Sequence, residues 1–312
     1  MKNNSVTKNL SYLHPCFNKN AKRLYGRVHL PVAVHCNVQC NYCNRMYGCV
    51  NESRPGVTNF IIEPENVISY LDFICKEDCN LSVVGIAGPG DPFCEPEKTL
   101  ETITRVRKAY PDLLICVSSN GLNVPQYVDR LARAEVTHVT ITVNALDPDI
   151  GEMIYSWIKI ENNYYTGKGS AAILISRQLE SIIRLKQKGI TVKVNTVIIP
   201  GINENQVETI AKKLSHLRVD IMNIIPMIPV AGAPFEDLDR LPSFKLQRLR
   251  NLAAVHIPQM GHCARCRADA IGRLDSDGSN DLYLAIKRQN GFQGVFGHQS
   301  VKNLHDKRWM NE

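Results

Sequence analysis

Short apolar runs rich in β-branched residues alternate along the chain with longer amphipathic runs. The short runs predict six strands, and their continuous apolar character is typical of parallel strands buried on both faces. They cover residues 28–34, 81–87, 113–118, 138–143, 190–199 and 219–225. The longer runs each follow a turn signal and predict helices. These cover residues 65–76, 96–109, 125–134, 171–188 and 204–217.

Strands that alternate with helices through short connections form right-handed βαβ units and a parallel sheet. About six units fit between residues 28 and 230, which is too few for a closed eight-fold barrel. We therefore expect an α/β fold with an open, partial (β/α)6 TIM-like barrel, in preference to a doubly wound sheet. An N-terminal extension (1–27) precedes this core (28–230). A C-terminal extension (231–312) follows it, and prolines accumulate where it begins.

The composition is that of an ordinary folded enzyme. Of 312 residues, 44% are hydrophobic and 21% are charged, which supplies a sizeable core and excludes a disordered chain. The net charge of +7 is spread without a dense basic block, so it gives no indication of a nucleic-acid partner. The sequence shows neither a secretory signal nor an apolar run long enough to span a membrane, and we expect a cytoplasmic protein.

Eleven cysteines are the unusual feature of the composition. An odd number excludes complete disulfide pairing, and in a reducing compartment many cysteines indicate metal ligation, redox chemistry or packing. Cys36, Cys40 and Cys43 follow the first predicted strand, at the end of the sheet where ligand sites of α/β folds gather. Three thiolates can hold three irons of a [4Fe–4S] cluster and leave the fourth iron open. A zinc knuckle, which needs a fourth ligand, and simple packing are the alternatives.

The C-x3-C-x2-C spacing, with Tyr42 before the last cysteine, resembles the signature of radical S-adenosylmethionine (SAM) enzymes. The resemblance implies a radical SAM barrel in which SAM chelates the open iron of the cluster. It also implies reductive cleavage of SAM to methionine and a 5′-deoxyadenosyl radical, which abstracts a hydrogen atom. The protein then has to orient SAM and exclude water.

The resemblance further implies that residues at the ends of the following strands bind SAM. The glycine-rich segment 85–92 follows the second predicted strand, and its glycines permit a ligand to approach the backbone closely. The residues expected at the cofactor are Gly88, Gly90, Asp91, Ser118, Asn120, Asn144 and Asn195. For the serine and the asparagines, local turn capping is an equally good interpretation.

Five blocks narrow the resemblance to the NifB family of nitrogenase cofactor maturases. They are residues 14–17, 36–45, 49–56, 88–93 and 262–269. Their joint occurrence is specific, whereas the cysteine triad alone indicates only the superfamily. Residues 275–312 are too short for the NifX-like domain that many NifB proteins carry, so we expect the stand-alone form. His35, before the triad, departs from the lysine or alanine expected there, but it is no predicted ligand.

The C-x2-C pair of Cys263 and Cys266 can bind an edge of a cluster, bind zinc or form a redox disulfide. The family resemblance implies two further [4Fe–4S] units that are joined during the reaction. It assigns Cys16, Cys263 and Cys266 to one unit, and His14, Cys49 and Cys116 to the other. For Cys116, packing as a small core residue is the alternative.

The residues that we expect to take part in catalysis are Glu52, Cys49 and Cys116. Glu52 would be a carboxylate ligand or a proton-handling group, and an exposed loop glutamate is the alternative. Cys75, Cys79 and Cys94 receive no role, and packing is the better interpretation of the first two.

The reaction implied by the resemblance uses two molecules of SAM. One donates a methyl group to a cluster sulfide, and the second yields the radical that attacks this methyl. A carbide remains at the centre of an [8Fe–9S–C] product, NifB-co or the L-cluster, the precursor of the nitrogenase FeMo cofactor. The implied partners are the NifEN scaffold, a NifX carrier, cluster donors such as NifU, and ferredoxin or another low-potential electron donor.

Two other functions remain open at this point. A different radical SAM maturase with one auxiliary cluster would explain Cys263 and Cys266, but not the blocks at 14–17 and 49–56. A non-enzymatic iron–sulfur carrier or a zinc-stabilised interaction module would also need many cysteines. Cleavage of SAM would exclude this second alternative.

Overall fold

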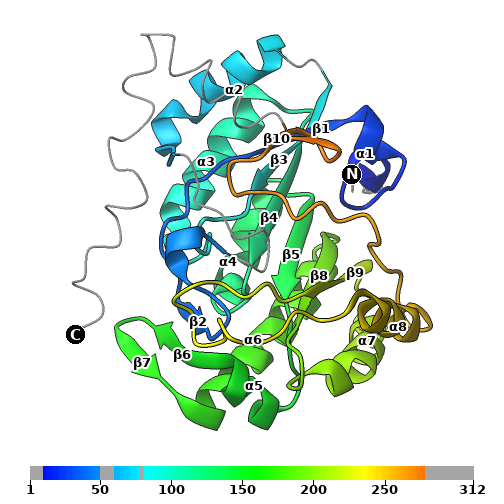
Figure 1. Ribbon diagram of the computed structural model, residues 1–312. Helices are drawn as coiled ribbons and strands as arrows, with labels where there is room; N and C mark the ends of the chain where they lie inside the picture. Colours follow the sequence, from blue (N-terminus) through cyan, green and yellow to red (C-terminus); the bar gives the residue numbers. More distant parts are fainter. Residues whose placement is uncertain (1–9, 50–59, 78–79, 278–312) are drawn as a thin grey trace.

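Six parallel strands form a curved sheet at the centre of the molecule (Figure 1). The computed structural model describes residues 10–49, 60–77 and 80–277. The parallel strands are β1 (Gly26–His29), β3 (Leu81–Ile86), β4 (Leu114–Ser119), β5 (His138–Thr142), β8 (Thr191–Ile198) and β9 (Ile221–Pro226), and they are hydrogen-bonded in this order. The predicted open, partial barrel is confirmed, because the sheet curls but β1 and β9 do not pair.

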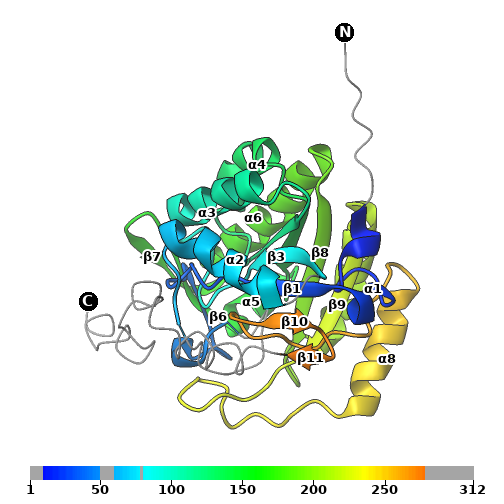
Figure 2. The same ribbon diagram turned by 90° about the horizontal axis from the view of Figure 1, so that it is seen from above.

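Helices cover the convex face of this sheet, as Figure 2 shows from above. They are α2 (Val67–Glu77), α3 (Pro96–Ala109), α4 (Val124–Arg133), α6 (Gly167–Gln187) and α7 (Val207–His216). Short 3-10 turns, η3 (Pro64–Asn66) and η4 (Glu204–Gln206), lead into α2 and α7. The bounds of α3 agree with the prediction. Pro96 begins the helix, and Arg107 and Lys108 lie in its last turn, where positive charges interact favourably with the helix dipole.

The main hydrophobic core lies between the sheet and these helices. Val84, Ile115 and Val194 contribute from the strands and are almost completely buried. Ile103 and Leu185 contribute from the facing helices. Burial on this side explains the apolar runs from which the strands were predicted, while the concave side carries polar and sulfur-containing residues.

The tail of the described chain extends the sheet beyond β1. Strand β10 (Ile271–Arg273) pairs antiparallel with β1, and β11 (Ser276–Asp277) pairs antiparallel with β10. The guanidinium of Arg27, on β1, donates to the carbonyl oxygens of Gly272 at 2.5 Å and Arg273 at 3.1 Å. This pairing covers the edge of β1 that would otherwise be open.

A small antiparallel sheet, absent from the sequence prediction, supports the cysteine triad. It consists of β2 (Val38–Cys40), β6 (Tyr155–Ile160) and β7 (Asn163–Tyr165), and α5 (Pro148–Ile154) precedes β6. Within β6 only Tyr155 and Ile158 are buried, so the strand lacks the continuous apolar character used to recognise the others.

The remaining described elements are η1 (Leu10–Leu13), α1 (Ala21–Leu24), η2 (Arg45–Tyr47) and α8 (Ser243–Ala254). Helix α8 packs against α7 and β9 within the proline-rich stretch, where the sequence predicted only an extension. Pro242 is its N-cap, so proline here begins a helix. No helix in the described ranges is both long enough and apolar enough to cross a membrane.

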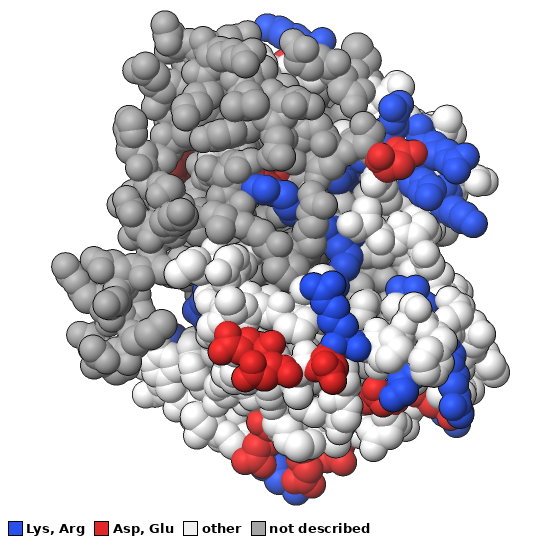
Figure 3. Space-filling model, viewed as in Figure 1, with Lys and Arg blue, Asp and Glu red and all other residues white. Residues whose placement is uncertain are grey.

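Charges of both signs are interspersed on the face shown in Figure 3. Exposed ion pairs of the described chain include Arg130 with Glu97 and Lys168 with Asp149, each with a nitrogen–oxygen distance of 2.6 Å. Exposed pairs of this kind contribute little to stability.

Gly90 lies where two backbone segments approach most closely, at the carboxyl ends of β1 and β3. Its amide donates to the carbonyl oxygen of Ala33 at 2.6 Å, and the next amide, of Asp91, donates to that of His35 at 2.7 Å. A Cβ atom on Gly90 would lie 2.1 Å from the carbonyl oxygen of His35. Only glycine fits this position.

We expect Gly90→Ala to lower the free energy of unfolding by about 2 kcal/mol or more, because the backbone opposite cannot yield without breaking these hydrogen bonds. Chemical denaturation followed by circular dichroism measures the change. Gly169→Ala is the matched control, since a Cβ there meets nothing within 4 Å and alanine favours helix α6. Equal losses in the two variants would contradict the prediction.

Candidate functional site

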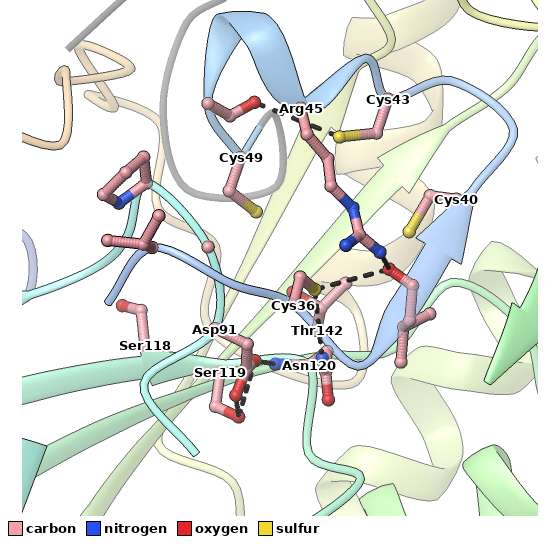
Figure 4. A pocket seen from close by; sticks show the side chains of 15 residues that line it. Cys36, Cys40, Cys43, Arg45, Cys49, Asp91, Ser118, Ser119, Asn120 and Thr142 are labelled. Atoms are coloured by element: carbon pink, nitrogen blue, oxygen red, sulfur yellow. Dashed lines mark hydrogen bonds between the residues drawn. The ribbon is translucent and has the colours of Figure 1, made fainter. Parts of the chain in front are cut away.

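Cys36, Cys40 and Cys43 line one pocket of about 580 Å3, a volume that includes space open to solvent. Figure 4 shows their sulfur atoms around this space, with Cys49 on another wall and the side chain of Arg45 extending between them. The other lining residues come from the loop after β3 and from the ends of β4 and β5. They are Val34, Val38, Gly48, Pro89, Gly90, Asp91, Ser118, Ser119, Asn120 and Thr142. We refer to this space as the triad pocket.

Local pairing holds the three cysteines in place. Strand β2 contains Cys40 and pairs with β6, and the amide of Cys43 donates to the carbonyl oxygen of Cys40 at 3.0 Å. The side-chain amide of Gln39 bridges the carbonyl oxygens of Cys40 at 3.1 Å and Cys43 at 2.8 Å. Arg45 donates to the carbonyl oxygen of Val38 at 3.1 Å. The loop is thus shaped by its own polar residues, and its sulfur atoms remain directed at one space.

Burial controls the charge of these thiols. It raises the pKa of Cys36 and of Cys40, and the positive charge of Arg45 opposes the shift at both. The side chain of Asn120 also donates toward the sulfur of Cys36 at 3.7 Å. A bound cation would favour the thiolate form further. Three thiols with this environment fit the ligand set of a four-iron cluster with one open iron.

The carboxylate of Asp91 joins the loops that surround the triad pocket. It accepts hydrogen bonds from the backbone amides of Phe93 at 2.9 Å and Asn120 at 2.6 Å, and from the hydroxyl of Ser119 at 3.0 Å. Burial raises the pKa of Asp91, and these hydrogen bonds lower it. Asn120 in turn donates to the side-chain oxygen of Asn37 at 2.7 Å, beside the first cysteine of the triad.

A second pocket, of about 630 Å3 with the same inclusion of open space, contains most of the other predicted ligands. His14 and Cys16 come from the N-terminal segment, Cys116 from β4, and Cys263 and Cys266 from the segment after α8. These five side chains are separated by up to 252 positions in the sequence, as the numbers of His14 and Cys266 show. We refer to this space as the sulfur chamber.

The electrostatics of the sulfur chamber follow from burial and from one lysine. Burial raises the pKa of Cys16 to about 12, and Lys193 is the main group that opposes this shift. Burial also lowers the pKa of His14, and electrostatic interactions with His138 and Lys193 lower it further. Burial lowers the pKa of His138 to about 3. Nδ1 of His14 accepts from the amide of Cys16 at 3.1 Å. Both imidazoles are therefore neutral near pH 7.

The triad pocket and the sulfur chamber adjoin. Among the described residues, only Ser118 lines both pockets. It lies two positions after Cys116 on β4, so the two side chains project from the same face of the strand. A group released in the triad pocket therefore has Ser118 between it and the chamber.

The structure distributes the predicted ligands differently from the two sets named above. Cys49 lines the triad pocket, whereas His14 and Cys116 line the chamber together with Cys16, Cys263 and Cys266. Glu52 and Cys79 lie outside the described residues. None of the ten cysteines that the structure describes, Cys75 and Cys94 among them, forms a disulfide.

The predicted SAM contacts also separate. The triad pocket is lined by Gly90, Asp91, Ser118 and Asn120. Gly88 directly precedes Pro89 in the sequence, and Pro89 also lines this pocket. Asn195 lines the chamber instead. Asn144 is fully buried; it donates to the hydroxyl of Tyr42 at 2.7 Å and accepts from the amide of Val197 at 2.8 Å. Their assignment to SAM remains a prediction.

Sequence reasoning missed several polar residues of these pockets. Arg27, Lys193 and Asn223 line the chamber, and Arg45 and Thr142 line the triad pocket. Lys193 had a detectable signal, because a lysine interrupts an apolar run that is otherwise suited to a buried strand. For Arg27 and Thr142 the sequence offers no comparable signal.

No three His, Cys, Asp or Glu side chains among the described residues are arranged as ligands of a single metal ion. A four-iron cluster makes a different demand, because each thiolate binds a separate iron. In both the triad pocket and the chamber, several thiols line one shared space from different sides.

Comparison with known families supports the interpretation of the triad. The model of the Radical SAM superfamily matches residues 30–214, which is more than half of the chain. The match begins just after β1 and ends within α7. It therefore includes the cysteine triad and most of the curved sheet.

Curated relatives give a narrower result. The FeMo cofactor biosynthesis protein NifB of Chlorobaculum tepidum is 44% identical over 273 residues, covering 88% of this chain and 64% of that protein. The protein of the same name from Klebsiella pneumoniae is 44% identical, covering 86% and 58%. That from Frankia alni is 39% identical, covering 96% and 60%. The chain thus spans about three fifths of the length of these relatives.

Solved structures agree on the fold. Methylornithine synthase (PylB) superposes with a TM-score of 0.52 at 16% identity, covering 77% of this chain and 65% of that one. SuiB of Streptococcus suis, bound to S-adenosylmethionine, superposes with a TM-score of 0.54 at 12% identity, covering 78% and 51%. Identities this low show the fold alone. The match to the family model shows that the chain belongs to the radical SAM superfamily, and the curated relatives confirm its resemblance to NifB proteins.

Proposed function

We propose that the chain is a radical SAM enzyme of nitrogenase cofactor biosynthesis, which joins two [4Fe–4S] units and inserts a carbide derived from a SAM methyl group. The product would be the [8Fe–9S–C] NifB-co or L-cluster; two [4Fe–4S] units supply eight of its sulfurs, so the ninth would have to come from a separate inorganic sulfur donor. One observation carries the proposal: a second chamber lined by four cysteines and two histidines adjoins the triad pocket. A radical enzyme acting on a small organic molecule has no need for such a chamber.

In the triad pocket, Cys36, Cys40 and Cys43 would hold the resident cluster. When bound, this cluster and SAM supply a one-electron cleavage that yields a carbon-centred radical. The protein contributes position: the Asp91 carboxylate fixes the loop that carries Gly90, and Asn120 links this loop to Asn37 and Cys36. Backbone groups of the segment 88–92 would contact SAM, as the sequence predicts.

In the chamber, the iron–sulfur units would be substrates. Cys16, Cys263 and Cys266 line it together and would hold one unit. A second unit, held by His14, Cys49 and Cys116, would extend toward the triad pocket, because Cys49 lines that pocket. Arg27 donates to the sulfur of Cys266 at 3.2 Å and would stabilise its thiolate. Glu52 would handle protons removed from the methyl group.

The partners follow from this reaction. NifU or a similar donor would supply the four-iron units, and ferredoxin or another low-potential protein would supply electrons. The product would pass to the NifEN scaffold, directly or through NifX. We place these steps in the cytoplasm, where thiols remain reduced.

Iron stoichiometry tests the proposal. After anaerobic reconstitution we expect about twelve irons per chain, three four-iron units, and formation of 5′-deoxyadenosine when SAM and dithionite are added. The Cys263→Ser, Cys266→Ser double variant should lose about four irons and still cleave SAM reductively, because the triad pocket is unchanged. Iron analysis and chromatography of the nucleoside products measure both quantities.

Cys75→Ser is the control for loss of a cysteine on a distant helix. If the wild-type chain binds about four irons, and the double variant produces cofactor precursor as well as the wild type, the three-unit arrangement is wrong. If SAM is not cleaved at all by the reconstituted wild type, the radical SAM activity itself is wrong.

Ser118 tests the connection between the two pockets. A larger side chain at this shared position should obstruct transfer of the SAM methyl group without removing an iron ligand. We therefore expect Ser118→Leu to reduce formation of S-adenosylhomocysteine about tenfold or more, which corresponds to about 1.4 kcal/mol. Iron content should remain that of the wild type. Ser118→Ala, which removes the hydroxyl without adding volume, should retain most methyl transfer. Equal loss in both variants would show that the hydroxyl matters and that the narrow junction does not.

A further inference from the structure

Arg45 carries the only positive charge among the described residues that line the triad pocket. Figure 4 shows its guanidinium group extending between Cys36 and Cys40. The group donates to the carbonyl oxygen of Val38, which lies midway between these two cysteines in the sequence. The charge is therefore placed inside the loop that would hold the resident cluster.

The ring of Trp157, on β6, is a second contact of this guanidinium. The central carbon of the Arg45 guanidinium lies 4.9 Å from the centre of the Trp157 ring, within the range of a cation–π interaction. Tryptophan is the aromatic side chain that binds cations best in this way. Strand register places Trp157 opposite Gln39, whose side chain bridges the carbonyl oxygens of Cys40 and Cys43. The pairing of β2 with β6 therefore brings the ring to the loop that carries the cysteines.

The position of the Trp157 ring is supported in turn by β7. The ring packs edge to face against that of Tyr164, with 4.9 Å between the ring centres and 84° between the ring planes. The ammonium group of Lys159 lies over the Tyr164 ring at 5.1 Å. Tyr164 is 50% exposed, so these contacts extend from the surface of the small sheet to the triad pocket. They favour the rotamers of Arg45 that keep its charge in the pocket.

A fixed positive charge beside a four-iron cluster changes how easily the cluster is reduced. Reduction by one electron, taken from a low-potential donor, adds one negative charge to the cluster. Nearby positive charge stabilises this more negative state, and the net charge of a cluster and its surroundings helps to set its potential. Val38 and Cys40 are buried, so water screens the charge of Arg45 little at this point.

We propose that Arg45 raises the reduction potential of the resident cluster, and that Trp157 is the positioning residue that holds this charge beside the cysteines. The inference rests on the part of the proposed function that assigns the resident cluster to Cys36, Cys40 and Cys43. It does not depend on the sulfur chamber. If the two residues act as one unit, the ring should matter only while the arginine is present.

Redox titrations of the reconstituted full chain test the role of Arg45. The electron paramagnetic resonance signal that changes on addition of SAM identifies the triad cluster, and its midpoint potential is measured without SAM. We expect Arg45→Met to lower the equilibrium constant for reduction about tenfold, a shift of about 59 mV to more negative potential for one electron. Arg45→Lys keeps the charge but not the planar group, so its potential should lie between those of Arg45→Met and the wild type. The iron content should equal that of the wild type in both variants.

A double-mutant cycle tests the role of Trp157. Trp157→Leu should shift the potential to more negative values when Arg45 is present, and should cause no further shift in the Arg45→Met chain. Trp157→Phe keeps an aromatic face and should stay near the wild type. Lys159→Met is the matched control, because it removes a cation that contacts a ring of the same small sheet but does not line the triad pocket. Its potential should equal that of the wild type.

An unchanged potential in Arg45→Met would overturn the inference and leave the proposed function intact. So would an unchanged potential together with weaker SAM binding in equilibrium dialysis, which would assign the guanidinium to the SAM carboxylate. If both Arg45 variants lose the signal that responds to SAM, the arginine is needed to assemble the site, and the inference is wrong.

The positioning role of Trp157 has its own contrary outcomes. Equal shifts from Trp157→Leu with and without Arg45 would show that the ring acts on the cluster by another route. Loss of the signal in Trp157→Leu would make the ring structural. Either result would refute the positioning role. If the wild-type chain binds no cluster that responds to SAM, the proposed function fails, and the inference fails with it.

Discussion

The hydrogen bonds of one buried carboxylate determine the arrangement of the candidate site. Asp91 accepts from the loop that carries it and from the end of β4, and its own amide donates to the loop after β1. Hydrogen bonds to a carboxylate are stronger than those between neutral groups, and here they offset part of the cost of burying the charge, although burial still raises the pKa of Asp91. Hydrogen bonds therefore join the loop that carries the cysteine triad, the glycine-rich segment and Asn120 around the triad pocket.

Much of the fold was predictable because the barrel is a repetition of one simple unit. A strand buried on both faces leaves a continuous apolar run, as in residues 113–117, and a surface helix that begins with proline, as at Pro96, has a clear start. The small sheet was not predictable in this way. Strand β2 has three residues inside a metal-binding motif, and β6 buries only Tyr155 and Ile158. Helix α8 was hidden by the prolines around it.

Several of the predicted ligands line pockets in the structure, but in other groups than the family resemblance implied. The proximity of Cys36, Cys40 and Cys43 follows from their spacing, because all three lie in one short segment, residues 36–43. No local sequence spacing indicates the chamber. Cys116 and Cys263 line it together only because β4 and the segment after α8 reach the same side of the sheet. The same is true of Lys193, whose isolated charge in an apolar strand indicated something unusual, whereas its neighbours emerged only from strand register.

The pairing of β10 with β1 also bears on the order of events during synthesis. Strand β1 leaves the ribosome early, but the strand that covers its outer edge is residues 271–273, and Cys263 and Cys266 lie just before it. Domains fold largely as units once their sequence is available. The triad pocket has all of its described residues by position 142, whereas the chamber lacks walls until the tail has docked. Under the proposed function, the residues that would hold the resident cluster are thus synthesised well before the last residues that would hold the iron–sulfur substrates.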